Sequence, residues 1–396
     1  MIPDRRLRIL TVANVPPDPN SGAAGTVYHT NVALRELGHQ VDELWNHDLG
    51  QRKIAHGNLH SLLEQPRMYR DAVVRAIQKN AYDVVQMSQP QAWLAAKTLK
   101  RQGYRGVIVN RSHGLELRVD SVLPEWHRRM GIPESRFPRS LVTPVIRRLL
   151  QKQWPAAVRS SDAIVVTCEM DREFLVRSVP EAAGRTFAVH HGIGTDLTST
   201  EAPPLTTDRL QKILYVGQHS FIKGYHILAE VLNRSLKDHR SLSCTWVTAE
   251  RGHSEVLGLL VPEIQNRVRL LGWRDQSQLT ELYDSHGIFV FPSYFEGAGK
   301  ASLEALSRRM AVVASDTGAM RDYLNESKGG ILCEVGRAGE FSEAITSLIS
   351  DPQAAAAAAE RGFQLAKDKT WQRCATGLVK IYETILAGRS TRESRS

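Results

Sequence analysis

The chain has 396 residues, which is too long for one typical hydrophobic core and predicts two or three domains. Hydrophobic residues make up 42% and charged residues 23% of the chain, as in ordinary globular proteins, so a largely disordered protein is excluded. No apolar run reaches the roughly 18 residues that span a bilayer, and the start, MIPDRRLRIL, lacks the apolar core of a signal peptide.

The net charge of +9 favours anionic partners: nucleic acid, an anionic membrane surface or a phosphorylated substrate. The sequence has no zinc-finger or RNP-type signature, so we expect no nucleic-acid partner. The cysteines are scattered, without metal-type spacing, at Cys168, Cys244, Cys333 and Cys374. This pattern predicts a reduced, cytoplasmic compartment.

The first predicted strand is apolar and covers 7–15, and prolines then turn the chain into a loop. The glycine-containing loop 21–25 leads into a helix that ends near Leu37, before Gly38. A strand, a glycine loop and a helix start together predict an anion-binding site with Gly22 as a candidate contact. A tight turn that needs glycine explains the same residues equally well.

Two further buried strands are predicted over 82–87 and 105–110. His113 follows the second strand and precedes a glycine, which places it at the carboxyl end of a sheet, where ligands bind. A histidine with a purely structural hydrogen bond is the alternative.

The stretch 127–159 is strongly basic and has helical periodicity. Its predicted apolar face contains Val145, Ile146, Leu149, Leu150 and Trp154, and its polar face contains Arg147, Arg148, Gln151 and Lys152. Such a helix lies on an anionic membrane or packs its apolar face on the core, and both interpretations fit.

Another strand is predicted over 161–167, and the first domain closes near His190 and His191. Neighbouring residues of a strand point to opposite faces, so this histidine pair predicts no metal site. A Thr- and Pro-rich linker follows over 195–210, and the strand 212–217 then opens a second domain.

Candidate ligand-binding residues follow the strands of this second domain. Gln218 and Lys223 come after the strand 212–217, and Trp273 and Arg274 end a strand over 268–273. Trp273 could stack on a ligand or equally pack between helices.

The most informative run is FVFPSYFEGAGKASLEA, from Phe289 to Ala305. A buried strand over 287–291 leads into a loop that carries Glu296, and Glu304 lies inside a helix over 302–309. The loop residues Gly297, Ala298 and Gly299, with the helix start, predict backbone contacts to an anion. A solvated loop and helix is the alternative interpretation.

The remaining predicted elements are a strand over 311–315, a helix after Asp351-Pro352, and an amphipathic helix over 371–386. Residues 389–396 are predicted to be a disordered tail.

The spacing Glu296-x7-Glu304 resembles the signature of retaining glycosyltransferase family 4, which has the GT-B architecture. Lys223-Gly224, Gly38-His39-Gln40-Val41, His113 and Gly272-Trp273 also match family elements, so the resemblance covers about residues 8–386. It implies an α/β fold with two Rossmann-like domains that face a cleft. These are an acceptor domain (1–194) and a donor domain (211–370), with a C-terminal helix (371–388) that crosses back to the first.

The resemblance also implies metal-independent transfer from a nucleotide sugar, with a UDP-sugar preferred to a GDP-sugar and no cofactor. In it Glu296 holds the sugar, Glu304 the ribose, and Lys223 the diphosphate, while Gly22 and His113 contact the donor. The resemblance also makes Trp273 and Arg274 candidate neighbours of the nucleotide base. Gln218 stands where the family has arginine, and Lys300 is a candidate replacement cation. No protein general base is assigned, because the leaving phosphate oxygen can take the acceptor proton.

The acceptor is expected to be a sugar or a lipid-linked sugar, and the basic stretch 127–159 around Arg147 suggests attachment to the inner face of a membrane. Two other classes of function stay open. A nucleotide-sugar epimerase or a sugar phosphorylase has the same architecture, and a catalytically silent membrane-surface protein would explain the basic segment alone.

Overall fold

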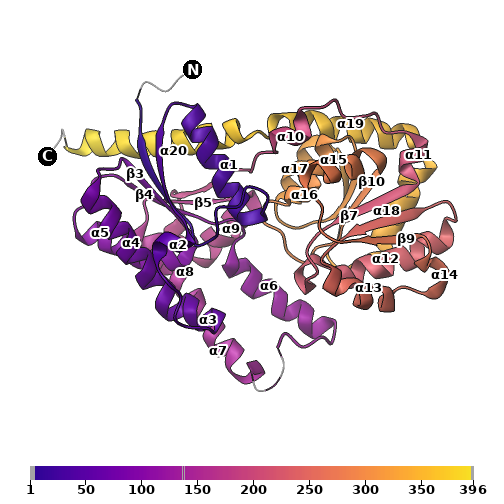
Figure 1. The fold of residues 1–396 in the computed structure, drawn as a ribbon, viewed down its shortest axis with the longest axis horizontal. Coiled ribbons are helices and arrows are strands. Elements are labelled where there is room, and N and C mark those ends of the chain that lie inside the picture. Colours follow the sequence, from indigo (N-terminus) through magenta and orange to yellow (C-terminus); the bar gives the residue numbers. More distant parts are fainter. Residues whose placement is uncertain (1–4, 136, 138, 394–396) are drawn as a thin grey trace. The chain divides into compact units, whose positions relative to one another are not determined.

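The computed structural model describes residues 5–393, except 136 and 138. The chain divides into two compact units (Figure 1). Unit 1 contains Met1–Gly192 and Trp371–Ser396, and unit 2 contains Ile193–Thr370.

The described part of unit 1 contains a six-stranded sheet in the order β2-β1-β3-β4-β5-β6, and every neighbouring pair is parallel. Its strands are β1 (Arg8–Val12), β2 (Gln40–Leu44), β3 (Val84–Ser88), β4 (Val107–Arg111), β5 (Ala163–Val166) and β6 (Thr186–Ala188). The central strands β3, β4 and β5 are buried along their whole length, as expected for a parallel sheet that is covered on both faces.

Two helical layers cover this sheet. Its α-helices are α1 (Gly22–Glu36), α2 (Asn46–Leu49), α3 (Gly57–Leu59), α4 (Gln65–Lys79), α5 (Trp93–Arg101), α6 (Glu116–Arg129), α7 (Arg139–Gln151), α8 (Gln153–Ser160), α9 (Glu169–Ser178) and α20 (Trp371–Glu393). Alternate residues of the strands point to opposite faces, so Ile9 packs with α1 and α20 while Leu10 packs with α4 and α5. The last helix therefore completes the core of unit 1, as predicted.

The described part of unit 2 also contains a six-stranded parallel sheet, in the order β12-β11-β10-β7-β8-β9. Its strands are β7 (Lys212–Val216), β8 (Ser243–Val247), β9 (Val268–Leu271), β10 (Ile288–Phe291), β11 (Ala311–Ser315) and β12 (Gly330–Cys333). Its α-helices are α10 (Thr195–Thr198), α11 (Thr207–Leu210), α12 (Tyr225–Asp238), α13 (His253–Leu259), α14 (Pro262–Gln265), α15 (Gln276–Ser285), α16 (Lys300–Ser307), α17 (Ala319–Ser327), α18 (Ala338–Ser350) and α19 (Pro352–Asp368). Two parallel sheets with helices confirm the predicted α/β class.

The stretch 195–210, which was expected to be a linker, lies within unit 2 and carries two short helices. The buried guanidinium of Arg308 donates hydrogen bonds to the carbonyl oxygens of Leu197 and Thr200 at 2.9 and 2.8 Å. Arg209 donates to those of Pro203 and Pro204 at 2.7 and 3.0 Å. These bonds hold backbone carbonyls that no regular ladder satisfies.

Two predicted features of unit 1 need correction. The basic stretch contains the end of α6 and two further helices, α7 and α8, and Trp154 of α8 is buried in the core while Val145 and Leu149 of α7 are exposed. The predicted disordered tail is wrong over 389–393, because α20 continues to Glu393, and 394–396 lie outside the described residues. No helix of the described chain is both long and apolar enough to cross a bilayer.

Candidate active site

Each sheet has one point where the strand order reverses. In unit 2 the chain runs β7-β8-β9 in one direction and β10-β11-β12 in the other, so the reversal lies between β7 and β10. In unit 1 it lies between β1 and β3. Ligands of open α/β sheets bind at the carboxyl ends of the strands at this point. The predicted site residues Lys223 and Glu296 follow β7 and β10.

Glu296 and Lys223 form a direct ion pair in unit 2. Glu296 is 6% exposed, and its Oε1 atom accepts hydrogen bonds from Lys223 Nζ at 2.6 Å and Ser293 Oγ at 2.8 Å. Gly224 has a φ of +68°, and a Cβ there would lie 2.0 Å from the carbonyl oxygen of Pro292. The turn that carries Lys223 therefore packs directly against the end of β10 because residue 224 is glycine.

Glu304 lies in α16, one turn after Gly299. Glu304 is 5% exposed and its Oε2 atom accepts a hydrogen bond from the Tyr283 hydroxyl at 2.9 Å. Lys300 Nζ lies 3.6 Å from Glu304 Oε1. Burial, reinforced by the Glu304 carboxylate, raises the pKa of Tyr283 well above its usual value, so this hydroxyl remains a donor.

The predicted loop residues lie between these two carboxylates. Gly297, Ala298 and Gly299 are buried, and the Gly297 carbonyl oxygen accepts a hydrogen bond from the Ala319 amide at 2.9 Å. Gly299 has a φ of +60° and is the N-cap of α16. The positive dipole end of this helix and the Lys300 ammonium group form a positively polarised region.

Three other predicted contacts lie further along the carboxyl edge of the sheet. Gln218 is exposed just after β7. Trp273 is 53% exposed after β9, and the Arg274 side chain donates a hydrogen bond to the Trp273 carbonyl oxygen at 3.1 Å. Because β8 separates β9 from β7, the ends of β9 and β7 lie about 10 Å apart.

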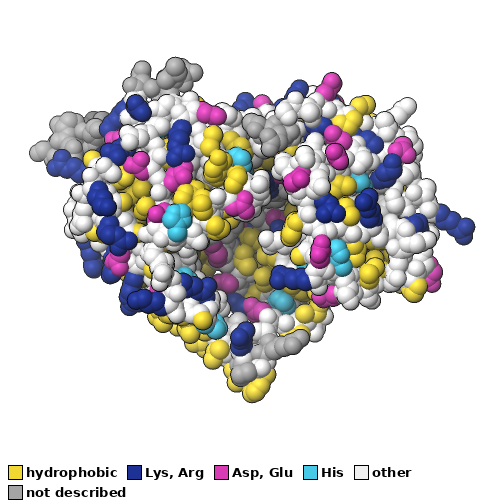
Figure 2. Space-filling view, in the orientation of Figure 1, with side chains coloured by type: hydrophobic (Ala, Val, Ile, Leu, Met, Phe, Trp, Pro, Cys, Tyr) yellow, Lys and Arg dark blue, Asp and Glu magenta, His cyan; other side chains and the backbone are white. Residues whose placement is uncertain are grey.

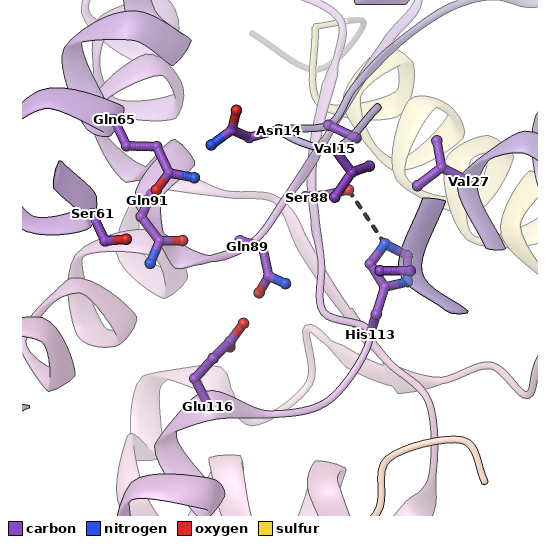
Figure 3. Close-up of a pocket in the computed structure, with 12 residues that line it drawn as sticks. Asn14, Val15, Val27, Ser61, Gln65, Ser88, Gln89, Gln91, His113 and Glu116 are labelled. Atoms are coloured by element: carbon purple, nitrogen blue, oxygen red, sulfur yellow. Dashed lines mark hydrogen bonds between the residues drawn. The ribbon is translucent and has the colours of Figure 1, made fainter. Parts of the chain in front are cut away.

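A cavity of about 230 Å³ lies at the strand reversal of unit 1. Side chains that follow β1, β3 and β4 line it together with side chains from α1, from the segment before α4 and from the start of α4 (Figure 3). The lining residues are Ala13, Asn14, Val15, Ala23, Val27, Ser61, Gln65, Ser88, Gln89, Gln91, His113 and Glu116.

His113 and Glu116 are the titratable groups of this lining. His113 Nε2 lies 3.4 Å from Ser88 Oγ, and burial, helped by the charge of Arg111, lowers its pKa to about 3. Burial, with smaller contributions from Asp171 and Asp120, raises the pKa of Glu116 to about 8. Both side chains are therefore mainly uncharged at neutral pH.

The structure does not show a need for glycine at position 22. Gly22 is exposed at the start of α1, and a Cβ there would meet no atom within 4 Å. A Cβ at Gly25, by contrast, would lie 2.4 Å from the carbonyl oxygen of Pro19.

The described residues contain no group of three or more His, Cys, Asp and Glu side chains that could hold a metal ion.

Several residues that the fold brings to these sites were not predicted from the sequence. Ser293 and Tyr283 are hydrogen-bond partners of the two carboxylates, and Gln89 and Glu116 line the cavity of unit 1. Their place after predicted strands could have indicated Gln89 and Glu116, because they follow the strands that end at Met87 and Asn110 and ligands bind at the carboxyl ends of strands.

Comparison with known proteins finds similarity to glycosyltransferases. Residues 200–365, which cover most of unit 2, match the family described as Glycosyl transferases group 1. The matches support a GT-B glycosyltransferase. A D-inositol 3-phosphate glycosyltransferase of Corynebacterium jeikeium is 26% identical over 270 residues, which span 64% of this chain and 62% of that protein. A glycogen synthase of Mycobacterium tuberculosis is 24% identical over 95% of this chain and 94% of its own.

Solved structures match the fold over almost the whole chain. A sucrose-phosphate synthase from Thermosynechococcus elongatus has a TM-score of 0.74 at 19% identity, over 97% of this chain and all of that chain. The Anabaena protein HepE, solved in complex with UDP-glucose, has a TM-score of 0.64 at 17% identity, over 98% of this chain and all of that chain. Because these identities are below 20%, the similarity establishes the GT-B fold and nothing beyond the fold.

Proposed function

We propose that the protein is a retaining glycosyltransferase of family 4, which moves a sugar from a nucleotide sugar to a hydroxyl group. The observation that carries this proposal is the ion pair of the half-buried Lys223 with the buried Glu296 at the strand reversal of unit 2, followed by the buried Glu304 in the next helix. Two lysines and two carboxylates in one place suit a ligand with both a diphosphate and several hydroxyl groups. The HepE complex with UDP-glucose favours a UDP-sugar as donor.

The donor is placed along the carboxyl edge of the second sheet. Lys223, Lys300 and the amides at the start of α16 would neutralise the diphosphate, so positive charge is available from the chain itself. Glu304 would accept hydrogen bonds from the ribose and Glu296 from the sugar. Trp273 is exposed just after β9, whose end lies about 10 Å from that of β7, so it remains the candidate partner of the base.

Donor binding gives the first test. Isothermal titration with UDP-, GDP- and ADP-sugars should identify one donor, and slow hydrolysis of that donor needs no acceptor. Lys223→Ala should weaken donor binding about 10- to 100-fold, since a charged hydrogen bond contributes about 1.5–3 kcal/mol. Lys237→Ala, an exposed lysine of α12, is the matched control and should bind the donor normally.

Lys300→Ala tests the replacement cation separately. Donor affinity should fall about 10-fold, because Lys300 lies at the helix start where the diphosphate is placed. Unchanged affinity in Lys300→Ala, beside a loss in Lys223→Ala, would show that Lys300 does not replace the missing arginine at position 218.

Product analysis separates the proposed reaction from its rivals. A retaining transferase gives a glycoside with the anomeric configuration of the donor, and transfer should persist in a chelator. An epimerase changes the nucleotide sugar without an acceptor, and a phosphorylase releases a sugar phosphate.

One observation favours membrane association as an additional property. Nine large hydrophobic side chains are exposed in the described structure, and five of them lie in or just before α7. These are Phe137, Leu141, Val142, Val145 and Leu149, which we call the α7 apolar face. Hydrophobic side chains gather at the lower edge of Figure 2, where Figure 1 places α7.

The cations around the α7 apolar face favour an anionic lipid surface at the cytoplasmic side of a membrane. Arg139, Arg148 and Lys152 are exposed on or beside α7. Arg147 lies in the same helix but forms ion pairs with Asp120 at 3.5 Å and with Glu134, and its side chain is 15% exposed. The proposed lipid-binding surface therefore consists of the α7 apolar face and these three exposed cations.

The double substitution Leu141→Ser and Val145→Ser should reduce binding to phosphatidylglycerol vesicles at least about 10-fold, since each buried side chain contributes more than 1 kcal/mol. Co-sedimentation measures this effect. Leu257→Ser, which changes an exposed leucine of unit 2, is the control. Equal binding by the double variant and the unchanged protein would contradict a lipid surface on α7.

A further inference from the structure

Three polar atoms at the unit 1 cavity are buried and have no hydrogen-bond partner. They are Gln89 Oε1, His113 Nδ1 and Glu116 Oε2, each from a residue that lines the cavity. In Figure 3 the Glu116 carboxyl group and the Gln89 amide group point toward one another into this space. A buried polar group without a partner is costly, so three of them around one cavity indicate a ligand that supplies several hydrogen bonds.

The backbone holds Gln89 in an unusual conformation. Its φ of +75° is rare for a residue other than glycine and costs on the order of 1–3 kcal/mol. Two hydrogen bonds to β4 maintain it. The backbone N–H of Gln89 donates to the backbone carbonyl oxygen of Arg111 at 3.1 Å, and Asn110 Nδ2 donates to the backbone carbonyl oxygen of Gln89 at 2.7 Å. The side chain is thus positioned by the sheet, which is expected of a binding residue.

The lining is polar but carries no fixed positive charge. No lysine or arginine is among the described residues that line the cavity. Asparagine and glutamine amides are its main polar groups, from Asn14, Gln65, Gln89 and Gln91. Amides both donate and accept hydrogen bonds, which suits hydroxyl groups, whereas a phosphate buried here would meet no cation to neutralise it.

The cavity has space for a ring-sized ligand, since 230 Å³ equals the liquid volume of roughly eight water molecules. We propose that it binds the reacting end of the acceptor, and that this end is a neutral polyhydroxylated ring, a sugar or a cyclitol, without a phosphate group. This inference rests on the proposed glycosyl transfer and names the acceptor class for it. A lipid or glycan attached elsewhere on the acceptor is compatible with it.

Direct ligand binding tests the selectivity without any donor. Methyl glycosides and myo-inositol, each paired with its own monophosphate, are titrated into the full protein and followed by saturation-transfer NMR. For each ring that binds, the neutral member should bind at least about 10-fold more tightly than its monophosphate, because the phosphate loses its hydration without gaining a cation. Tighter binding of the monophosphates, or no binding of any neutral ring, would overturn the proposal.

Three variants test the residues. Glu116→Ala should weaken neutral-ring binding at least about 10-fold, and Glu116→Gln should bind within about 3-fold of the unchanged protein, because it keeps an uncharged hydrogen-bonding group. Gln91→Lys should shift the ratio toward the monophosphate about 10-fold. An unchanged ratio in Gln91→Lys together with unchanged binding in Glu116→Ala would place the ring elsewhere. Melting temperatures show whether each variant folds.

Donor hydrolysis by the unchanged protein separates this inference from the function beneath it. If no nucleotide sugar binds or is hydrolysed while neutral rings bind with the expected selectivity, glycosyl transfer is wrong and the pocket assignment stands. If a donor is hydrolysed and only phosphorylated rings bind, glycosyl transfer stands and the assignment of the pocket to a neutral ring is wrong.

Discussion

Glu296→Gln should reduce the turnover of sugar transfer about 100- to 1000-fold, the loss typical of removing one group that stabilises a transition state. The carboxylate accepts hydrogen bonds from Lys223 and Ser293, so its position is set before the donor arrives. Glutamine keeps the shape but loses the charge that holds Lys223 and that would bind the sugar hydroxyls. The turnover number with the donor identified by titration measures this effect.

Binding of the free nucleoside diphosphate should show the opposite behaviour in the same variant. Without the Glu296 charge, Lys223 is free to neutralise the diphosphate, so affinity should be unchanged or higher. Glu263→Gln, at an exposed glutamate of α14, is the control for both measurements. Turnover within about 5-fold of the unchanged protein would remove Glu296 from its assigned role.

The elements that could be predicted from the sequence are those with a strong local pattern. The apolar run 287–291 and the run AVVAS at 311–315 predicted β10 and β11, because strands buried on both faces need continuous apolar residues. The strand β2 was missed. Its sequence, QVDEL, lies at the edge of the sheet and has Val41 as its one buried residue, so it has no such run.

The candidate site was predicted in part for a related reason. The spacing of Glu296 and Glu304 is local and appears in the sequence, and so does Lys223 after its strand. Tyr283 meets Glu304 through the fold, and Gln89 and Glu116 approach one another because β3 and β4 are neighbours in a sheet. A single sequence does not record which strands pair, so these contacts could not be predicted.

The stretch 195–210 shows how a distant side chain can reverse a local interpretation. Threonine, proline and few apolar residues are typical of a linker. Arg308, more than 100 positions away, donates hydrogen bonds to three carbonyl oxygens of this stretch, those of Leu197, Thr200 and Glu201. Its remaining donors bind both carboxylate oxygens of Asp284 at 2.6 Å.

Arg308→Met should therefore lower the stability of unit 2 by about 3 kcal/mol, the lower end of the range for breaking a buried ion pair, because Asp284 is itself partly exposed. For a domain of this size the calorimetric melting temperature should fall by roughly 6–12 °C. Arg337→Met, which removes an exposed partner of Glu334, should change stability by less than about 0.5 kcal/mol.

Limited proteolysis distinguishes a general loss of stability from release of this stretch. If Arg308 holds 197–201 on unit 2, cleavage there should accelerate in Arg308→Met below the melting transition, because three backbone carbonyls lose their partner and the stretch opens locally. Arg308→Lys should be intermediate, since an ammonium group cannot reproduce the five-donor geometry of a guanidinium group. Equal cleavage in all three proteins would mean that packing of the buried Leu197 and Ala202 holds the stretch without the arginine.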